Sequence, residues 1–263
     1  MPNGEAETCG SIGRRHYLLG IAGMCACCAV PGAIAQERSP IQGDGGCFFL
    51  EQVAGQVTTD VRQRTFRTST GVAQSDAAVY QMLTRAATAF GFESGRYPSF
   101  RFIPPKGEGG DGYATNAVTL DANAQGLVAL SVELLHGSLP EELKLVGFEV
   151  ILGHEFAHIY QARKTLTGAL FAANSTGKLV ELHSDFLAGW FMSKRNSLDR
   201  ESLNVAVNAL FSRGDNSVNK PGHHGTKAER YAAVMQGFIR GPTTDHVDGA
   251  SDNAIAYLEE LRK

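Results

Sequence analysis

ILGHEFAHI (residues 151–159) carries two histidines four positions apart, with a glutamate directly after the first. Residues four apart lie on one face of an α-helix, about 6 Å apart along the axis, so His154 and His158 can both direct an imidazole nitrogen at one ion. Glu155 lies beside them, where its carboxylate can reach a water molecule on that ion, which is the position of a general base. The stretch therefore predicts a helix that carries a metal site.

Apolar residues surround these polar side chains within the helix. The apolar residues that flank the histidines are typical of a buried helix: Ile151, Leu152, Phe156, Ala157 and Ile159. Unpaired imidazoles are costly in such surroundings, because they lose their hydrogen bonds to water. A surface helix with scattered polar residues is the alternative interpretation, and these flanks argue against it.

A third ligand is expected in ELHSD (residues 181–185), because a catalytic zinc site needs three protein ligands and an open position. Glu181 and Asp185 share a helical face, so Glu181 can bind zinc while Asp185 accepts a hydrogen bond from the second nitrogen of a ligating histidine. The apolar run FLAGWF (residues 186–191) argues against a solvated acidic face. His183 is the competing ligand, although it points to a different side of the helix.

Apolar periodicity, capping residues and turn signals divide the rest of the chain. Helices are expected over 75–90, 138–163, 178–194, 199–211, 226–238 and 253–261, with Ser138 as the cap of the second. Strands are expected over 97–103, 117–120 and 127–132, with an exposed glycine-rich turn over 104–112. These elements predict an α+β fold in which a small sheet is followed by helices.

Three segments resemble known zinc peptidases. GHEFAHI (153–159) followed by ELHSDFLAG (181–189) is similar to the gluzincin metallopeptidases, and the run 116–158 resembles the CAAX-prenyl and HtpX-like peptidases. HGT (224–226), followed by Arg230 and by GF at 237–238, is similar to bacterial neutral zinc metallopeptidases. The resemblance implies a zincin-like single domain, with a small sheet packed on an active-site helix and a helical C-terminal half, in which His154, His158 and Glu181 hold zinc.

GHHG (residues 222–225) precedes a helix whose Thr226 and Glu229 form a capping-box pattern. If this loop lies near the zinc, His224 can donate a hydrogen bond to the oxyanion of a tetrahedral intermediate. His224 is therefore a second candidate catalytic residue, with an ordinary loop histidine as the alternative. The sequence assigns no role to His223.

Arg14 and Arg15 lead directly into an apolar stretch that ends at Val30, and AIA (33–35) has the small residues that a signal peptidase requires. This segment resembles a twin-arginine export signal, with a retained anchor or an ordinary secretory signal as the alternative. We expect an export signal over 1–35, a leader segment packed on the domain over 36–74, and a zinc metallopeptidase domain over 75–263. The mature protein is expected to be periplasmic or extracellular, with no stable membrane insertion.

Cysteine usage and charge narrow the class of protein further. Four of the five cysteines lie within the expected export signal, and Cys47 alone cannot form an internal disulfide framework. A net charge of −3 gives no general attraction to nucleic acid or to anionic membranes. The expected partner is therefore a peptide or protein substrate, and the sequence leaves the oligomeric state undefined.

These features predict a zinc-dependent peptidase, an endopeptidase rather than an exopeptidase. Zinc would polarise the scissile carbonyl and activate a water molecule, and Glu155 would move the proton from that water to the leaving amine. By resemblance, the strand over 127–132 is expected to be a sheet edge that pairs with extended substrate. The alternatives are a non-catalytic zinc-binding module and a metallohydrolase that acts on a non-peptide amide. Glu155 favours catalysis, since a structural zinc site usually has a fourth protein ligand and no base.

Overall fold

The structure is a computed structural model that describes residues 65–103, 112–136, 141–174, 176–210 and 224–262. All of them belong to one compact unit, Pro40–Lys263. The expected export signal, most of the leader segment, Cys47, Ser138 and His223 lie outside the described residues. The helices and strands are α2 (Ala73–Ala89), β1 (Ser99–Ile103), β2 (Gly112–Thr115), β3 (Leu127–Ser131), α3 (Glu141–Arg163), α4 (Leu166–Asn174), α5 (Lys178–Ser193), α6 (Arg200–Leu210), α7 (Lys227–Arg240) and α8 (Val247–Glu260), with 3-10 turns at Val132–Leu135 and Gly241–Thr243.

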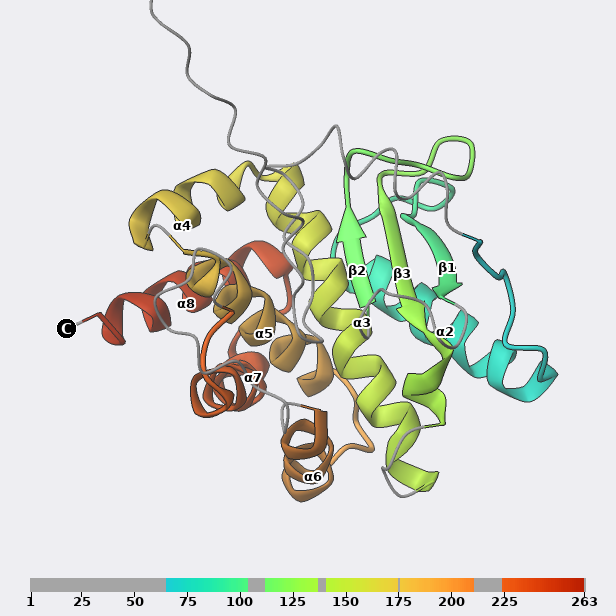
Figure 1. Ribbon diagram of the computed structural model, residues 1–263. Helices are drawn as coiled ribbons and strands as arrows, with labels where there is room; N and C mark the ends of the chain where they lie inside the picture. Colours follow the sequence, from blue (N-terminus) through green and yellow to red (C-terminus); the bar gives the residue numbers. More distant parts are fainter. Residues whose placement is uncertain (1–64, 104–111, 137–140, 175, 211–223, 263) are drawn as a thin grey trace, which may run out of the picture. The chain divides into compact units, whose positions relative to one another are not determined.

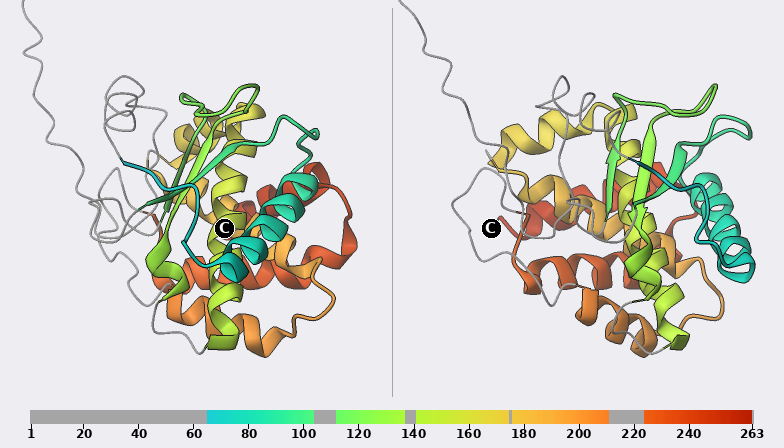
Figure 2. Two further views of the ribbon diagram at one scale, coloured as in Figure 1. Left: turned by 90° about the vertical axis from the view of Figure 1, so that its right-hand side faces the viewer. Right: turned by 45° about the vertical axis from the view of Figure 1, so that its right-hand side comes forward.

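The fold is α+β, as predicted, and the helix that carries the histidines lies at its centre. Helix α3 lies between the three-stranded sheet and the helices α4 to α8 (Figure 1). Helix α2 packs against α3 and the sheet, as a second direction of view also shows (Figure 2). The C-terminal half is helical, and no helix among the described residues is long and apolar enough to cross a membrane.

The sheet has the order β1-β3-β2, with β1 parallel and β2 antiparallel to β3. The prediction that β3 is a sheet edge is therefore wrong, because both of its sides pair with a neighbouring strand. The strand that lies next to α3 is β2 (Figure 1). Chain order alone did not reveal this arrangement, because the last strand inserts between the first two.

The strand predicted over 117–120 is also wrong, since the structure has β2 at Gly112–Thr115 instead. The Thr115 hydroxyl accepts a hydrogen bond from Ala117 N at 3.1 Å, which turns the chain away from the ladder. The following loop is fixed elsewhere, because the Ser99 hydroxyl accepts hydrogen bonds from Leu120 N and Asp121 N at 2.9 and 3.0 Å. The amides of Ala117, Leu120 and Asp121 therefore donate to side chains rather than to a neighbouring strand.

Gly112 belongs to β2 rather than to the exposed glycine-rich turn that the sequence predicted, and it is buried. A Cβ atom at this position would lie 2.5 Å from Leu130 Cδ2 and 3.3 Å from Glu155 Oε1. The missing side chain therefore lets β2 approach both β3 and the histidine-bearing helix closely.

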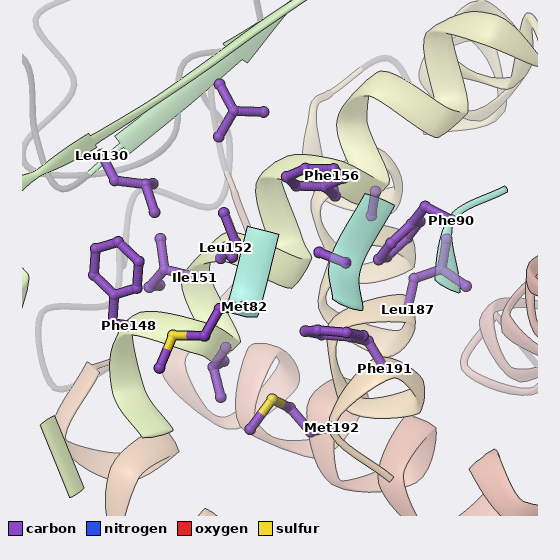
Figure 3. Packing of buried hydrophobic residues seen from close by; sticks show 14 of the residues in the cluster. Met82, Phe90, Leu130, Phe148, Ile151, Leu152, Phe156, Leu187, Phe191 and Met192 are labelled. Atoms are coloured by element: carbon purple, nitrogen blue, oxygen red, sulfur yellow. The ribbon is translucent and has the colours of Figure 1, made fainter. Parts of the chain in front are cut away.

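The core forms where β3 faces the helices. Val128 and Leu130 belong to the large apolar cluster shared with α2, α3 and α5, whereas Leu127 and Ala129 belong to a smaller cluster on the opposite face of the sheet. This alternation is the period of two that a β-strand imposes. Phe156 of α3 lies in the large cluster with Phe90 and Leu187 (Figure 3).

The helices agree with the sequence for α2, α3, α5, α6 and α7 to within three residues at each end. Helix α7 has the predicted capping box, in which the Thr226 hydroxyl accepts from Glu229 N and the Glu229 carboxylate accepts from Thr226 N. Two differences are found: α4 was not predicted, and α8 begins at Val247 rather than 253.

Candidate metal centre

Helix α3 brings the two predicted histidines together on one face. The Nε2 atoms of His154 and His158 lie 3.0 Å apart, and their rings meet almost at a right angle. His154 is fully buried and His158 is 10% exposed. Because both rings turn the same nitrogen inward, the helical spacing delivers two donor atoms to one point.

Helix α5 supplies the third predicted group at this point. Glu181 Oε2 lies 3.3 Å from His154 Nε2, and Glu181 Oε1 lies 3.5 Å from His158 Nε2. One ligand atom from each of the three side chains lies within 4.8 Å of the other two, so His154, His158 and Glu181 form a possible metal-binding site. Helix α5 packs extensively on α3, which explains how groups 23 positions apart along the chain meet.

Asp185 contacts Nδ1 of His154, the ring nitrogen that does not face His158. The sequence predicted this contact. Asp185 Oδ1 lies 2.8 Å from His154 Nδ1, and the carboxylate accepts hydrogen bonds from Arg230 Nε at 2.8 Å and Nη2 at 2.9 Å. Burial by itself raises the pKa of Asp185, but the charges of Arg230 and His154 outweigh burial and lower it. The ionised carboxylate keeps the proton of His154 on Nδ1, which leaves Nε2 ready to bind a metal ion.

His158 is held by Gln161, a residue to which the sequence gave no role. His158 Nδ1 lies 3.0 Å from Gln161 Oε1, and Gln161 Nε2 donates to Val180 O at 2.8 Å. Since the amide nitrogen must face that carbonyl, the amide oxygen faces His158, and Nδ1 must carry the ring proton. The Ser184 hydroxyl also lies 3.1 Å from this nitrogen. His158 Nε2 is thereby left as a donor atom for a metal ion.

His183 belongs to the same hydrogen-bonded chain and is not a ligand. Its Nδ1 lies 3.1 Å from Gln161 Nε2, and its Nε2 lies 3.0 Å from the Ser251 hydroxyl of α8. Burial, together with the charge of His158, lowers the pKa of His183 to about 3. With both ring nitrogens in use, a neutral His183 supports Gln161 instead of reaching the triad.

Glu155 lies on the sheet side of α3 and is fully buried. Its Oε1 lies beside Gly112 of β2, at 3.3 Å from the place that a Cβ atom there would occupy. Glu155 is not a member of the group of three ligand residues. The structure thus places it next to the ligands along the helix, between α3 and β2.

His224 lies at the centre as well, at the start of the segment that leads into α7. Its Nδ1 is 3.4 Å from Glu181 Oε1, and its side chain is 18% exposed. Burial opposes protonation of His224, but the Glu181 carboxylate outweighs burial and raises the pKa of His224. His158 and His224 are the partly exposed members of the group, at 10% and 18% of their side chains.

The arrangement fits a cation at the point where the three side chains meet. Burial lowers the pKa of His158 to about 4, so its ring is neutral near pH 7. Burial alone raises the pKa of Glu181, yet His224 and His158 hold it well below its usual range, so the carboxylate is ionised. No described residue gives either oxygen of this buried carboxylate a hydrogen bond of normal geometry. Two nitrogen lone pairs and an ionised carboxylate therefore converge where a positive ion would satisfy all three.

The chain matches no known protein-family model, no curated protein and no solved structure. Helical spacing was enough to find His154, His158, Glu181 and Asp185, all of which lie together. Gln161 stands three positions after His158, on the same face of the helix, which is a weak indication of contact. Ser251 lies in a helix far along the chain, and nothing in the sequence indicates its contact with His183.

Proposed function

We propose that this protein is a zinc-dependent peptidase whose centre is held by His154, His158 and Glu181. The observation that carries the proposal is the convergence of these three ligand atoms within 4.8 Å, with Glu155 beside them on α3 but outside the group. Three protein ligands leave a position for water, and a neighbouring carboxylate that is not a ligand is suited to act as a base.

The donor set favours zinc among the common metal ions. Two imidazole nitrogens and one carboxylate form a set that is typical of catalytic zinc, whereas calcium and magnesium prefer oxygen ligands alone. The outer contacts of the histidines, to Asp185 and to Gln161, are of the kind that orient zinc ligands.

The residues have distinct tasks in this mechanism. A bound zinc ion would supply Lewis acidity to the scissile carbonyl and would make water easier to deprotonate near neutral pH. Glu155 takes the proton of the attacking water and delivers it to the leaving amine. Its burial between α3 and β2 excludes bulk water from this transfer.

His224 complements the charge that develops on the substrate. Its protonated form is favoured by Glu181, and its partial exposure lets a substrate reach it. A donor at this place can stabilise the oxyanion of the tetrahedral intermediate. Because β3 is a central strand, we assign extended peptide to β2, the strand beside Glu155 and α3. The export signal expected over 1–35 leads us to propose peptide or protein substrates outside the cytoplasm.

A zinc site that only stabilises the fold is the second candidate. The almost complete burial of the ligands favours it, since His154 and Glu181 have no exposed surface. Such a site usually closes its coordination with a fourth protein ligand and gains nothing from a base beside the metal. Glu155 is therefore the residue that separates the two functions.

The experiment compares the wild-type protein with Glu155→Gln, which keeps the shape of the side chain and removes the base. Metal content is measured by mass spectrometry, and cleavage is measured on a broad peptide library. We expect both proteins to hold about one zinc ion per chain. Glu155→Gln should cleave at least about a hundredfold more slowly, the usual contribution of a general base.

Glu133→Gln is the matched control, because Glu133 is an exposed glutamate outside the metal centre. It should retain both zinc and cleavage. Zinc in every variant with no cleavage by the wild-type protein would instead support the purely structural site.

A further inference from the structure

A cavity away from the metal centre lies where α2, α3, α5 and the start of α8 meet. Its volume is about 730 Å³, which falls in the size range of small-molecule sites. None of His154, Glu155, His158, Glu181 or His224 lines it. The cavity is thus distinct from the proposed catalytic centre, although it uses the same two helices, α3 and α5.

A charged cluster, in which two partly exposed arginines bind one buried glutamate, forms one part of the cavity wall. Glu149 of α3 has a side chain that is 2% exposed, and both of its oxygens are bound by arginines. Arg85 Nη2 of α2 donates to Oε1 at 2.6 Å, and Arg195 Nη1 donates to Oε2 at 2.9 Å. All three residues line the cavity.

The two guanidinium groups and the single carboxylate together carry a net charge of +1. Among the described residues, Arg85 Nη1 and Arg195 Nε and Nη2 have no hydrogen-bond partner. The other charged residues at the rim are already paired, since Lys194 binds Asp245 and Lys164 binds Asp248. The surplus charge and the spare donors therefore belong to the two arginines, and guanidinium groups suit a planar carboxylate.

The neighbouring wall is apolar and partly aromatic. Trp190 and Phe191 of α5 line the cavity with Ala89 of α2 and Val247 of α8, and the two aromatic residues are 1% and 4% exposed. A flat apolar body is the natural complement of such a wall, because it contacts the rings while it leaves water.

We propose that this cavity is a binding site for a small organic carboxylate with an aromatic or similarly flat apolar body. The carboxylate accepts hydrogen bonds from Arg85 and Arg195, and the body lies against the apolar wall of Ala89, Trp190, Phe191 and Val247. One negative charge on the ligand balances the one surplus positive charge of Arg85, Arg195 and Glu149. This site does not depend on the function of the metal centre.

Trp190 provides a direct readout, because it is the only tryptophan in the chain and it lines the cavity. The full-length protein is titrated with phenylacetate and 3-phenylpropionate, and the fluorescence of Trp190 is followed. Acetate tests the charge without the body, and phenylacetamide tests the body without the charge. We expect saturable binding of the two aromatic carboxylates and binding at least about tenfold weaker for both controls, since each lacks one half of the recognition.

Arg195→Gln and Arg85→Gln should each weaken phenylacetate binding by at least about tenfold, whereas Arg200→Gln, an exposed arginine outside the cavity, should not. Thr88→Phe is a second kind of variant that leaves the charged cluster intact. Thr88 is exposed and lines the cavity, so the larger ring occupies the space and should abolish binding.

Three results would overturn the proposal. They are the absence of a saturable change in Trp190 fluorescence at millimolar probe, equal binding of phenylacetamide, and unchanged binding in Thr88→Phe.

Discussion

Gln161 shows how one side chain can set the protonation state of a proposed metal ligand. Its amide joins His158 of α3 to Val180 and His183 of α5, and it has no exposed surface. Gln161→Leu keeps the approximate volume but removes the acceptor that holds the proton on His158 Nδ1. We expect zinc affinity to fall by about tenfold to a hundredfold, the usual effect of losing an outer contact of a ligating histidine. Competition with a chromogenic chelator measures this affinity.

Two further variants separate orientation from packing. Gln161→Glu restores the acceptor next to His158 and should recover part of the zinc affinity that Gln161→Leu loses. Gln81→Leu makes the same chemical change at an exposed position of α2 and should have no effect. Equal zinc affinities for the wild-type protein and Gln161→Leu would show that Gln161 serves packing alone.

His224 leads to a different kind of prediction, because we propose that it acts on the substrate rather than on a ligand. We expect His224→Ala to retain zinc but to lower kcat by about a hundredfold, the usual effect of losing an oxyanion donor. KM should change little, since the donor matters most in the transition state. Steady-state kinetics on a peptide identified in the library digest measures both constants. Unchanged turnover with zinc in place would rule out the proposed role.

The sequence predicted which side chains lie together where the spacing within one helix determines their positions. The spacing of His154 and His158, and of Glu181 and Asp185, fixes which side chains share a face, and the structure brings these four together. Arg230, by contrast, reaches Asp185 from another helix, 45 positions away along the chain. Helical periodicity carries no information on that distance, so only the packed structure reveals the contact.

At the scale of elements, the close contact of α5 and α7 brings Arg230 and His224 to the centre. Gly189 of α5 faces the carbonyl of Val234, and Gly237 of α7 faces the carbonyl of Phe186. A Cβ atom on either glycine would overlap the backbone of the other helix. Each glycine therefore allows an approach that any larger residue would prevent.

Gly189→Ala should force α5 and α7 apart and lower the free energy of unfolding by at least about 2 kcal/mol, in the range of overpacked cores. Gly168→Ala is the matched control within α4, because a Cβ atom at Gly168 has no neighbour within 4 Å. That change should stabilise the protein by up to about 1 kcal/mol, since alanine is the better helix former. Urea unfolding followed by circular dichroism measures both values. A Gly189→Ala protein as stable as Gly168→Ala would contradict the close packing.

The starts of two helices, α4 and α8, were not predicted from the sequence. Thr165 separates α3 from α4 with a φ of 55°, a left-handed conformation that usually marks a glycine. Helix α8 begins after His246, whose side chain forms no cap hydrogen bond. Both places lack the residue that normally indicates a helix boundary, so sequence patterns could not locate the starts of α4 and α8.

At the scale of the whole molecule, the class of fold was predictable but the order of the strands was not. Periodicities of two and of about 3.6 residues distinguish strands from helices locally, which was enough to predict an α+β fold. The insertion of β3 between β1 and β2 places Leu130 in one apolar cluster with Phe148 and Leu152 of α3 (Figure 3). These contacts join residues that are far apart along the chain, so local periodicity carries no information on the strand order.

The metal centre joins α3 to α5, and these helices connect the sheet to the C-terminal helices, so removal of the ion should weaken the whole domain. Glu181 would stay buried and ionised without its main counter-charge, which is unfavourable. Bound zinc at a hundred times its dissociation constant contributes about 2.7 kcal/mol to the free energy of unfolding. For a domain of this size that corresponds to a fall in Tm of about 5–10 °C when a chelator is added. Glu181→Gln, which weakens the site, should show a much smaller shift, and circular dichroism melting curves with and without chelator measure both. A zinc-loaded wild-type protein whose Tm does not respond to chelator would show that the ion does not stabilise this fold.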